Sequence, residues 1–95
     1  MILIIEDDST INSLLCGILK KSGYEVESCT DGLTGYNMAL DKDYQLILMD
    51  LMLPMKSGEE ILRALRKVKK TPVIESVKRL FKPYCLQNPL YLLRA

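Results

Sequence analysis

Two sets of acidic residues in this sequence follow apolar segments, where carboxylates could bind a cation or act as nucleophiles. Asp50 follows the apolar run Leu46–Met49, and the pair Glu6 and Asp7 follows the apolar run Met1–Ile5. An ionised carboxylate is costly to bury unless it is paired or binds a cation. Mg²⁺ prefers one or two carboxylates together with waters and phosphate oxygens, and a carboxylate beside such a cation can form an aspartyl phosphate. One aspartate nucleophile, two acidic ligands and a cation are a sufficient minimal set for phosphoryl transfer.

The same acidic residues also have ordinary interpretations. An aspartate just past a strand commonly lies in a loop or caps a helix, and Glu6 and Asp7 alone would be read in the same way. Pro54 lies four residues after Asp50, and a second acidic cluster likewise follows another apolar strand. This combination favours one shared site over unrelated capping residues.

Alternating strand and helix patterns must position these carboxylates. Apolar runs predict strands over residues 1–5, 24–28 and 45–49, and a fourth begins at residues 71–74. Helices are expected between them, the first beginning at Asp8 or Ser9 and ending at Ser22 and Gly23. The expected inward faces are Ile11, Leu14, Leu15, Ile18 and Leu19 in the first helix, Leu33, Tyr36 and Leu40 in the second, and Ile61, Leu62, Leu65 and Val68 in the third.

The third helix has further signals at both of its ends. Ser57 and Glu60 form the S-x-x-E pattern of a capping box at its start. Its last turn and exit are basic, which suits the negative end of the helix dipole. We interpret these basic residues as a solvated helix end and not as a nucleic-acid patch; they are Arg66, Lys67, Lys69 and Lys70.

Repeated strand–helix units with short turns predict an α/β fold with a doubly wound parallel sheet. Ligands of such sheets bind outside the carboxyl ends of the strands. Glu6, Asp7 and Asp50 all fall at that edge. The sequence therefore predicts one acidic site assembled from distant parts of the chain.

Composition limits the function classes. The 95 residues make one small domain, and 13 basic against 12 acidic residues leave no basic footprint for nucleic acid. Histidine is absent, which removes imidazole catalysis and imidazole-bound metals. Cys16, Cys29 and Cys85 are scattered and odd in number, as in a reduced cytoplasmic protein. No basic leader or membrane-length apolar run is expected to direct the chain to a membrane.

Glu6-Asp7-Asp8 after a strand, followed by Asp50-Leu-Met-Leu-Pro54 and then Gly58, resembles the receiver domain of bacterial two-component response regulators. The loop is most similar to receivers that precede winged-helix DNA-binding domains. The resemblance implies a flavodoxin-like receiver fold over residues 1–74. It implies that Asp50 accepts a phosphoryl group from a sensor histidine kinase, with Mg²⁺ held by Asp50, Asp7, Glu6 and the backbone carbonyl of Met52, while Asp8 serves the helix start.

The sequence departs from this family in its last part. A serine or threonine should end the fourth strand, but that position is Val77 with Ser76 beside it. The family lysine should end a fifth strand, and Lys82 before Pro83 has that signature but follows too soon. We therefore expect a fold incomplete at the C-terminus, with residues 75–95 an atypical segment. Two origins of this segment remain open. Either an internal segment has been lost, which would leave a remnant of the last strand and helix, or the reading frame changes after Ile74.

Three hypotheses of function follow. The first is a Mg²⁺-dependent phosphoacceptor module, not an enzyme. The second is a degenerate receiver fragment that binds a partner without a phosphate switch. The third, an aspartate-nucleophile phosphatase, is disfavoured because Met52 stands where a general acid would follow Asp50. A missing strand–helix unit would also expose a sheet edge, so we expect homodimers or poor solubility.

Overall fold

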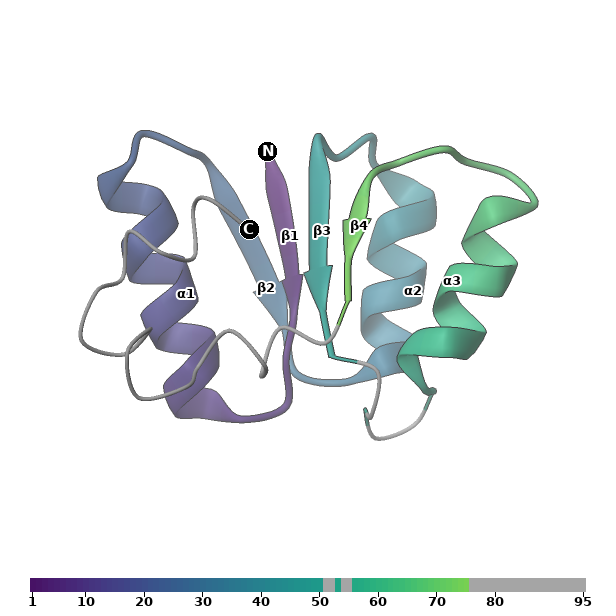
Figure 1. The fold of residues 1–95 in the computed structure, drawn as a ribbon, viewed down its shortest axis with the longest axis horizontal. Helices are drawn as coiled ribbons and strands as arrows, with labels where there is room; N and C mark the ends of the chain where they lie inside the picture. Colours follow the sequence, from purple (N-terminus) through teal and green to yellow (C-terminus); the bar gives the residue numbers. More distant parts are fainter. Residues whose placement is uncertain (51–52, 54–55, 76–95) are drawn as a thin grey trace.

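The computed structural model describes residues 1–50, 53 and 56–75 of the chain, in which strands and helices alternate (Figure 1). This alternation confirms the order expected from the sequence. The elements are β1 Ile2–Ile5, α1 Ser9–Lys21, β2 Val26–Cys29, α2 Gly32–Asp41, β3 Leu46–Met49, α3 Gly58–Arg66 and β4 Val73–Ile74.

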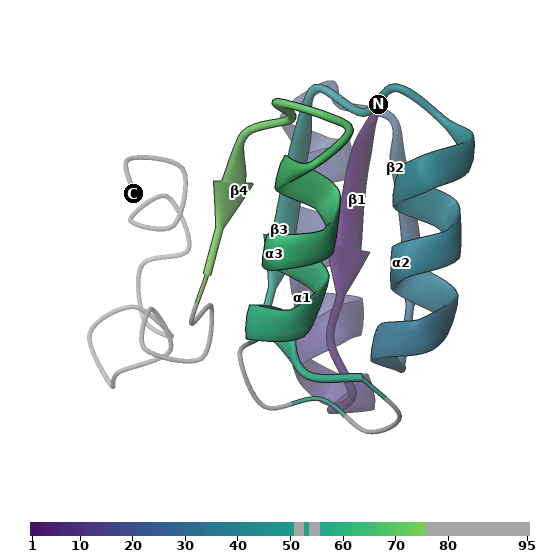
Figure 2. The same cartoon turned by 90° about the vertical axis from the view of Figure 1, so that its right-hand side faces the viewer.

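The strands form one parallel sheet in the order β2-β1-β3-β4. Helix α1 covers one face, and α2 and α3 lie side by side on the other (Figures 1 and 2). The predicted doubly wound α/β fold is therefore confirmed. None of the helices in the described ranges is long and apolar enough to span a membrane.

The two central strands supply both hydrophobic cores, because alternate residues of a strand point to opposite faces. Leu3 and Ile5 of β1 pack on the α2 and α3 side, whereas Ile2 and Ile4 pack on the α1 side. All four are buried. Full burial on both faces explains why these strands read as continuous apolar runs in the sequence.

The predicted helix ends are largely confirmed. The carboxylate of Asp8 accepts hydrogen bonds from the backbone N–H groups of Thr10 and Ile11, at 2.9 and 3.1 Å. Gly23, with φ of 94°, follows the last turn of α1 in the left-handed conformation that glycine tolerates. The Ser57 hydroxyl accepts a hydrogen bond from the Glu60 N–H at 3.2 Å.

The inward face predicted for α2 was wrong for two of its three residues. Leu33 and Leu40 are exposed, and the buried positions are Gly32, Gly35 and Ala39. The helix lies close to β1, since a Cβ added at Gly35 would come within 2.5 Å of the Ile5 Cδ1 atom. Only small side chains fit directly against β1, so Leu33 and Leu40 face outward.

Two other inward positions were also wrong. Leu14 of α1 is 37% exposed, because the buried stripe runs through Asn12, Leu15 and Leu19. Val68 is 65% exposed, because α3 ends at Arg66 and the helical period does not continue.

Lys69 contradicts the interpretation of the basic run as a solvated end. Its Nζ donates to the backbone carbonyls of Ala39 at 3.0 Å and Lys42 at 2.8 Å, and lies 3.1 Å from a carboxylate oxygen of Asp43. A lysine from the α3–β4 connection thus binds carbonyl groups at the end of α2, which have no partner within their own helix. The other members of the run, Arg66, Lys67 and Lys70, are exposed as expected.

Candidate functional site

The ends of β1 and β3 bring the predicted acidic residues together. These strands are parallel neighbours with Ile5 opposite Met49, so the residues that follow them lie at the same edge. The ladder continues one step further, because the Asp50 N–H donates to the Ile5 carbonyl at 3.3 Å. On the other side of β1, the Glu6 N–H donates to the Cys29 carbonyl at 3.1 Å. Backbone pairing therefore holds both acidic segments.

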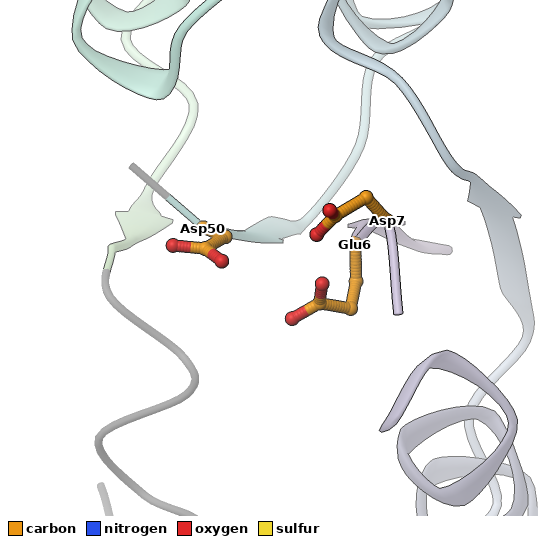
Figure 3. Close-up of side chains that lie close together, drawn as sticks. All are labelled: Glu6, Asp7 and Asp50. Carbon is orange, nitrogen blue, oxygen red and sulfur yellow. The ribbon is translucent and has the colours of Figure 1, made fainter. Parts of the chain in front are cut away.

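The three carboxylates gather at this edge of the sheet. Glu6, Asp7 and Asp50 each offer an oxygen atom, and these atoms lie within 4.8 Å of one another. Figure 3 shows Glu6 and Asp7 at one strand end and Asp50 at the next. Glu6 is 1% exposed and Asp50 is 7% exposed, while Asp7 is open to solvent. The cluster expected from the sequence is thus formed, with one member accessible from outside.

The start of α1 supports this cluster. One carboxylate oxygen of Glu6 accepts a hydrogen bond from the Asp8 N–H at 2.9 Å. The Asp8 side chain caps the helix, as expected from the sequence. The buried side-chain amide of Asn12 donates to the carbonyls of Glu6 and Cys29, both at 3.1 Å. Asn12 therefore joins α1 to the two strand ends beside the cluster.

Asn12 was not predicted from the sequence to belong to the site. The available signal was its position, three and seven residues before Leu15 and Leu19, on the buried side of an amphipathic helix. A polar residue on such a face needs hydrogen-bond partners. In this fold the partners are carbonyls at the ends of two strands.

The donor set fits a hard divalent cation. Carboxylate oxygens are ligands that Mg²⁺ prefers, at about 2.0–2.1 Å in an octahedral arrangement, so two ligands lie at most about 4.2 Å apart. The carboxylate oxygens of the cluster, within 4.8 Å of one another, lie close to that spacing. The backbone carbonyl of Met52, and also Ser76 and Lys82, lie outside the described residues, so their roles stay predictions.

A doubly wound parallel sheet with clustered carboxylates past its two central strands defines an α/β domain suited to cation-assisted phosphate chemistry. The chain belongs to the family of response regulator receiver domains, and the match to that family covers residues 2–79. It is therefore a receiver domain of two-component response regulators. Such domains are phosphoacceptor modules, generally not enzymes, which are phosphorylated by sensor histidine kinases and bind Mg²⁺ at an acidic site.

The curated relatives of this chain are regulatory proteins of bacteria. Over 73 residues, or 77% of this chain, it is 38% identical to the regulatory protein VanRB of Enterococcus faecalis. It is 42% identical, over the same length, to the transcriptional regulatory protein HprR of Escherichia coli. The matched part spans 33% of each relative, so the chain corresponds to about a third of their length.

Solved structures give the same fold. The chemotaxis response regulator CheY4 of Vibrio cholerae superposes with a TM-score of 0.82 at 26% identity, covering 98% of this chain and 92% of that one. The receiver domain of a sensor histidine kinase from Pseudomonas aeruginosa has a TM-score of 0.76 at 29% identity, covering 90% of this chain and 75% of that one. That structure holds a magnesium ion coordinated in its active site cleft.

Proposed function

We propose that this chain accepts a phosphoryl group on Asp50 from the phosphohistidine of a sensor histidine kinase, in a reaction that depends on Mg²⁺. Asp7 and Glu6 would hold the cation together with Asp50 and the backbone carbonyl of Met52. The observation that carries the proposal is the approach of the Glu6, Asp7 and Asp50 oxygens to within 4.8 Å at the end of two adjacent strands.

The chemistry uses few protein groups. An oxygen of Asp50 forms a bond to phosphorus while the phosphorus–nitrogen bond of the phosphohistidine breaks, and the electron pair stays on the imidazole nitrogen. A bound Mg²⁺ would neutralise charge on the transferred phosphoryl oxygens. Backbone pairing of Asp50 to Ile5 keeps the nucleophile at the sheet edge throughout. Exposed Asp7 leaves one side of the cluster accessible to the donor.

Intact-mass spectrometry tests the proposal. The protein is incubated with Mg²⁺ and acetyl phosphate, a small acyl-phosphate donor that replaces the kinase. We expect one added phosphoryl group on the wild type and none on Asp50→Asn. An equal adduct on Asp50→Asn, or no adduct on the wild type, would refute Asp50 as the acceptor.

Neighbouring acidic residues provide the matched controls. Asp7→Asn and Glu6→Gln remove one negative charge each from the cluster and should raise the Mg²⁺ concentration needed for labelling. Asp8→Asn removes a charge at the next position, but asparagine caps helices as well as aspartate does. We expect Asp8→Asn to be labelled like the wild type.

The alternative is a degenerate receiver that binds a partner without responding to phosphate. Its basis is the departure from the family pattern at Ser76, Val77 and Lys82, and with it we propose a division into a receiver core, residues 1–74, and an atypical segment, residues 75–95. Labelling of Asp50 without any change in the amide spectrum of the folded protein would favour this alternative. Turnover of a phosphomonoester by the same preparation would instead indicate the phosphatase hypothesis.

A further inference from the structure

Beyond the last residue of β1, a side chain of α1 takes part in holding the backbone. The Glu6 N–H donates to the Cys29 carbonyl at 3.1 Å, and the Glu6 carbonyl accepts a hydrogen bond from the Asn12 side-chain amide at 3.1 Å. The same amide also donates to the Cys29 carbonyl at 3.1 Å. These three bonds close a ring, so the peptide groups on both sides of Glu6 have fixed directions.

The side chain of Asn12 suits this place chemically. An amide nitrogen carries two N–H donors, which match the two carbonyls, whereas a hydroxyl has one donor and a carboxylate has none. The amide oxygen has a partner as well, because the Cys16 thiol donates to it at 3.5 Å. Asn12 is buried. Both polar atoms of its side chain therefore have partners within the fold, which fixes the orientation of the amide.

The peptide group that Asn12 binds is the one that joins Glu6 to Asp7, so its direction determines how Asp7 leaves the strand. The Glu6 carboxylate is anchored separately, since its Oε2 atom accepts a hydrogen bond from the Asp8 N–H at 2.9 Å. Asp8 in turn caps α1. The start of α1 thus places both Glu6 and Asp7. Asp50, by contrast, has its own backbone bond to Ile5.

We infer that Asn12 is a positioning residue for the Mg²⁺ ligands Glu6 and Asp7. The cluster oxygens lie within 4.8 Å of one another, and two ligands of one octahedral Mg²⁺ are at most about 4.2 Å apart. The cation therefore tolerates little displacement of this segment. Without the amide, the peptide between Glu6 and Asp7 would be free to turn, and ordering it again would weaken Mg²⁺ binding. This inference rests on the proposed function, in which both residues hold the cation.

Two truncations separate positioning from stability. Asn12→Ala removes the amide and should weaken Mg²⁺ binding about 10-fold, the lower end of the loss common for groups that orient metal ligands. Ile2→Val is the matched control, because it trims a buried side chain on the α1 side of the sheet, at the far end of β1. It should lower the melting temperature and leave the Mg²⁺ dissociation constant unchanged. Titrations followed by amide NMR, well below both melting temperatures, give these constants.

Phosphoryl labelling supplies a readout that a purely structural role would not change. Because the backbone bond of Asp50 does not involve Asn12, the yield of labelling by acetyl phosphate in Asn12→Ala should reach the wild-type value at saturating Mg²⁺. The Mg²⁺ concentration for half-maximal labelling should rise about 10-fold. If Asn12→Ala does not fold, Asn12→Ser takes its place. The single hydroxyl proton of the new side chain can serve only one of the two carbonyls, so Mg²⁺ binding should weaken several-fold.

The outcomes distinguish the two proposals. A wild type that binds Mg²⁺ and is labelled, with an unchanged dissociation constant in Asn12→Ala or in Asn12→Ser when that variant replaces it, would overturn this inference alone. An equal loss of affinity in Asn12→Ala and Ile2→Val would also overturn it. A yield that stays low at saturating Mg²⁺ would do the same, because the defect would then lie in Asp50 or in the whole fold. A wild type that neither binds Mg²⁺ nor is labelled would refute the proposed function, and this inference with it.

Discussion

The side-chain amide of Asn12 lies 3.1 Å from the backbone carbonyl of Glu6, the first residue of the acidic cluster. The same amide donates to the Cys29 carbonyl at 3.1 Å. One buried side chain on α1 therefore connects the ends of β1 and β2.

Replacing Asn12 by leucine should lower both stability and Mg²⁺ affinity. The buried Glu6 carbonyl would lose its donor, at a cost of about 1–3 kcal/mol, and the segment that carries Glu6 and Asp7 would lose its link to α1. Urea unfolding and calorimetric Mg²⁺ titration measure the two effects. Ser13→Ala, at the exposed neighbouring position, should change stability by less than about 0.5 kcal/mol. Unchanged stability in Asn12→Leu would contradict this role.

Lys69→Met should destabilise the domain by about 1.5–3 kcal/mol, the usual range for hydrogen bonds to a charged group. The substitution keeps the aliphatic stem but removes the donors to the carbonyls of Ala39 and Lys42. Lys70→Met, at an exposed position, is the matched control and should be nearly neutral.

The contribution of the Asp43 ion pair to stability can be measured apart from that of the two carbonyl contacts of Lys69. Asp43 is 99% exposed in its side chain, so its ion pair with Lys69 should contribute little. Asp43→Asn should therefore be close to wild type, and high salt should not remove the effect of Lys69→Met. Equal unfolding free energies for Lys69→Met and Lys70→Met would show that the contact with α2 is unimportant.

Alkaline pH should weaken the fold through Cys29. Burial raises the pKa of its thiol from 9.0 to about 11. The raised pKa belongs to the folded state. The stability that the protonated Cys29 thiol contributes is therefore fully present below pH 9 and is lost as the pH rises toward 11. The full loss corresponds to about 2–3 kcal/mol. Urea unfolding between pH 8 and pH 10 should show the beginning of this loss of stability in the wild type.

The variant Cys29→Ala should remove most of that pH dependence, although its stability at pH 7 will be lower. Tyr44 also has a raised pKa, from burial and from its 2.7 Å hydrogen bond to Glu27. Tyrosine ionises in the unfolded chain only near pH 10, so the lower part of the range reports on the cysteine. A flat profile up to pH 10 in wild type would contradict the prediction.

The order of strands and helices and the acidic cluster were predictable because their signals are local. Strand ends, helix caps and apolar periods each occupy a few consecutive residues, and parallel strands must share their carboxyl edge. Glu6, Asp7 and Asp50 could therefore be brought together without knowing any contact.

The errors at Leu33, Leu40 and Lys69 share one physical cause, which is the distance between elements. Leu33 and Leu40 have the right period for a buried face, but α2 lies too close to Ile5 for large side chains. Lys69 belongs to a basic run, yet the α3–β4 connection brings it to the end of α2. Neither separation is encoded in a short window of sequence, and Asn12 was missed because its partners are carbonyls from two other elements.

Self-association at the sheet edge, expected from the sequence, stays a prediction. In the described part of the chain, β4 is one of the two edge strands and has only two residues, with Ile47 opposite Val73 and Leu48 opposite Ile74. A strand edge offers backbone groups to another chain, so the oligomeric mass should rise with concentration. Light scattering coupled to size exclusion measures it, and hydrogen exchange at Val73 and Ile74 should slow as the protein associates. A monodisperse monomer that melts cooperatively at every concentration would rule out this pairing.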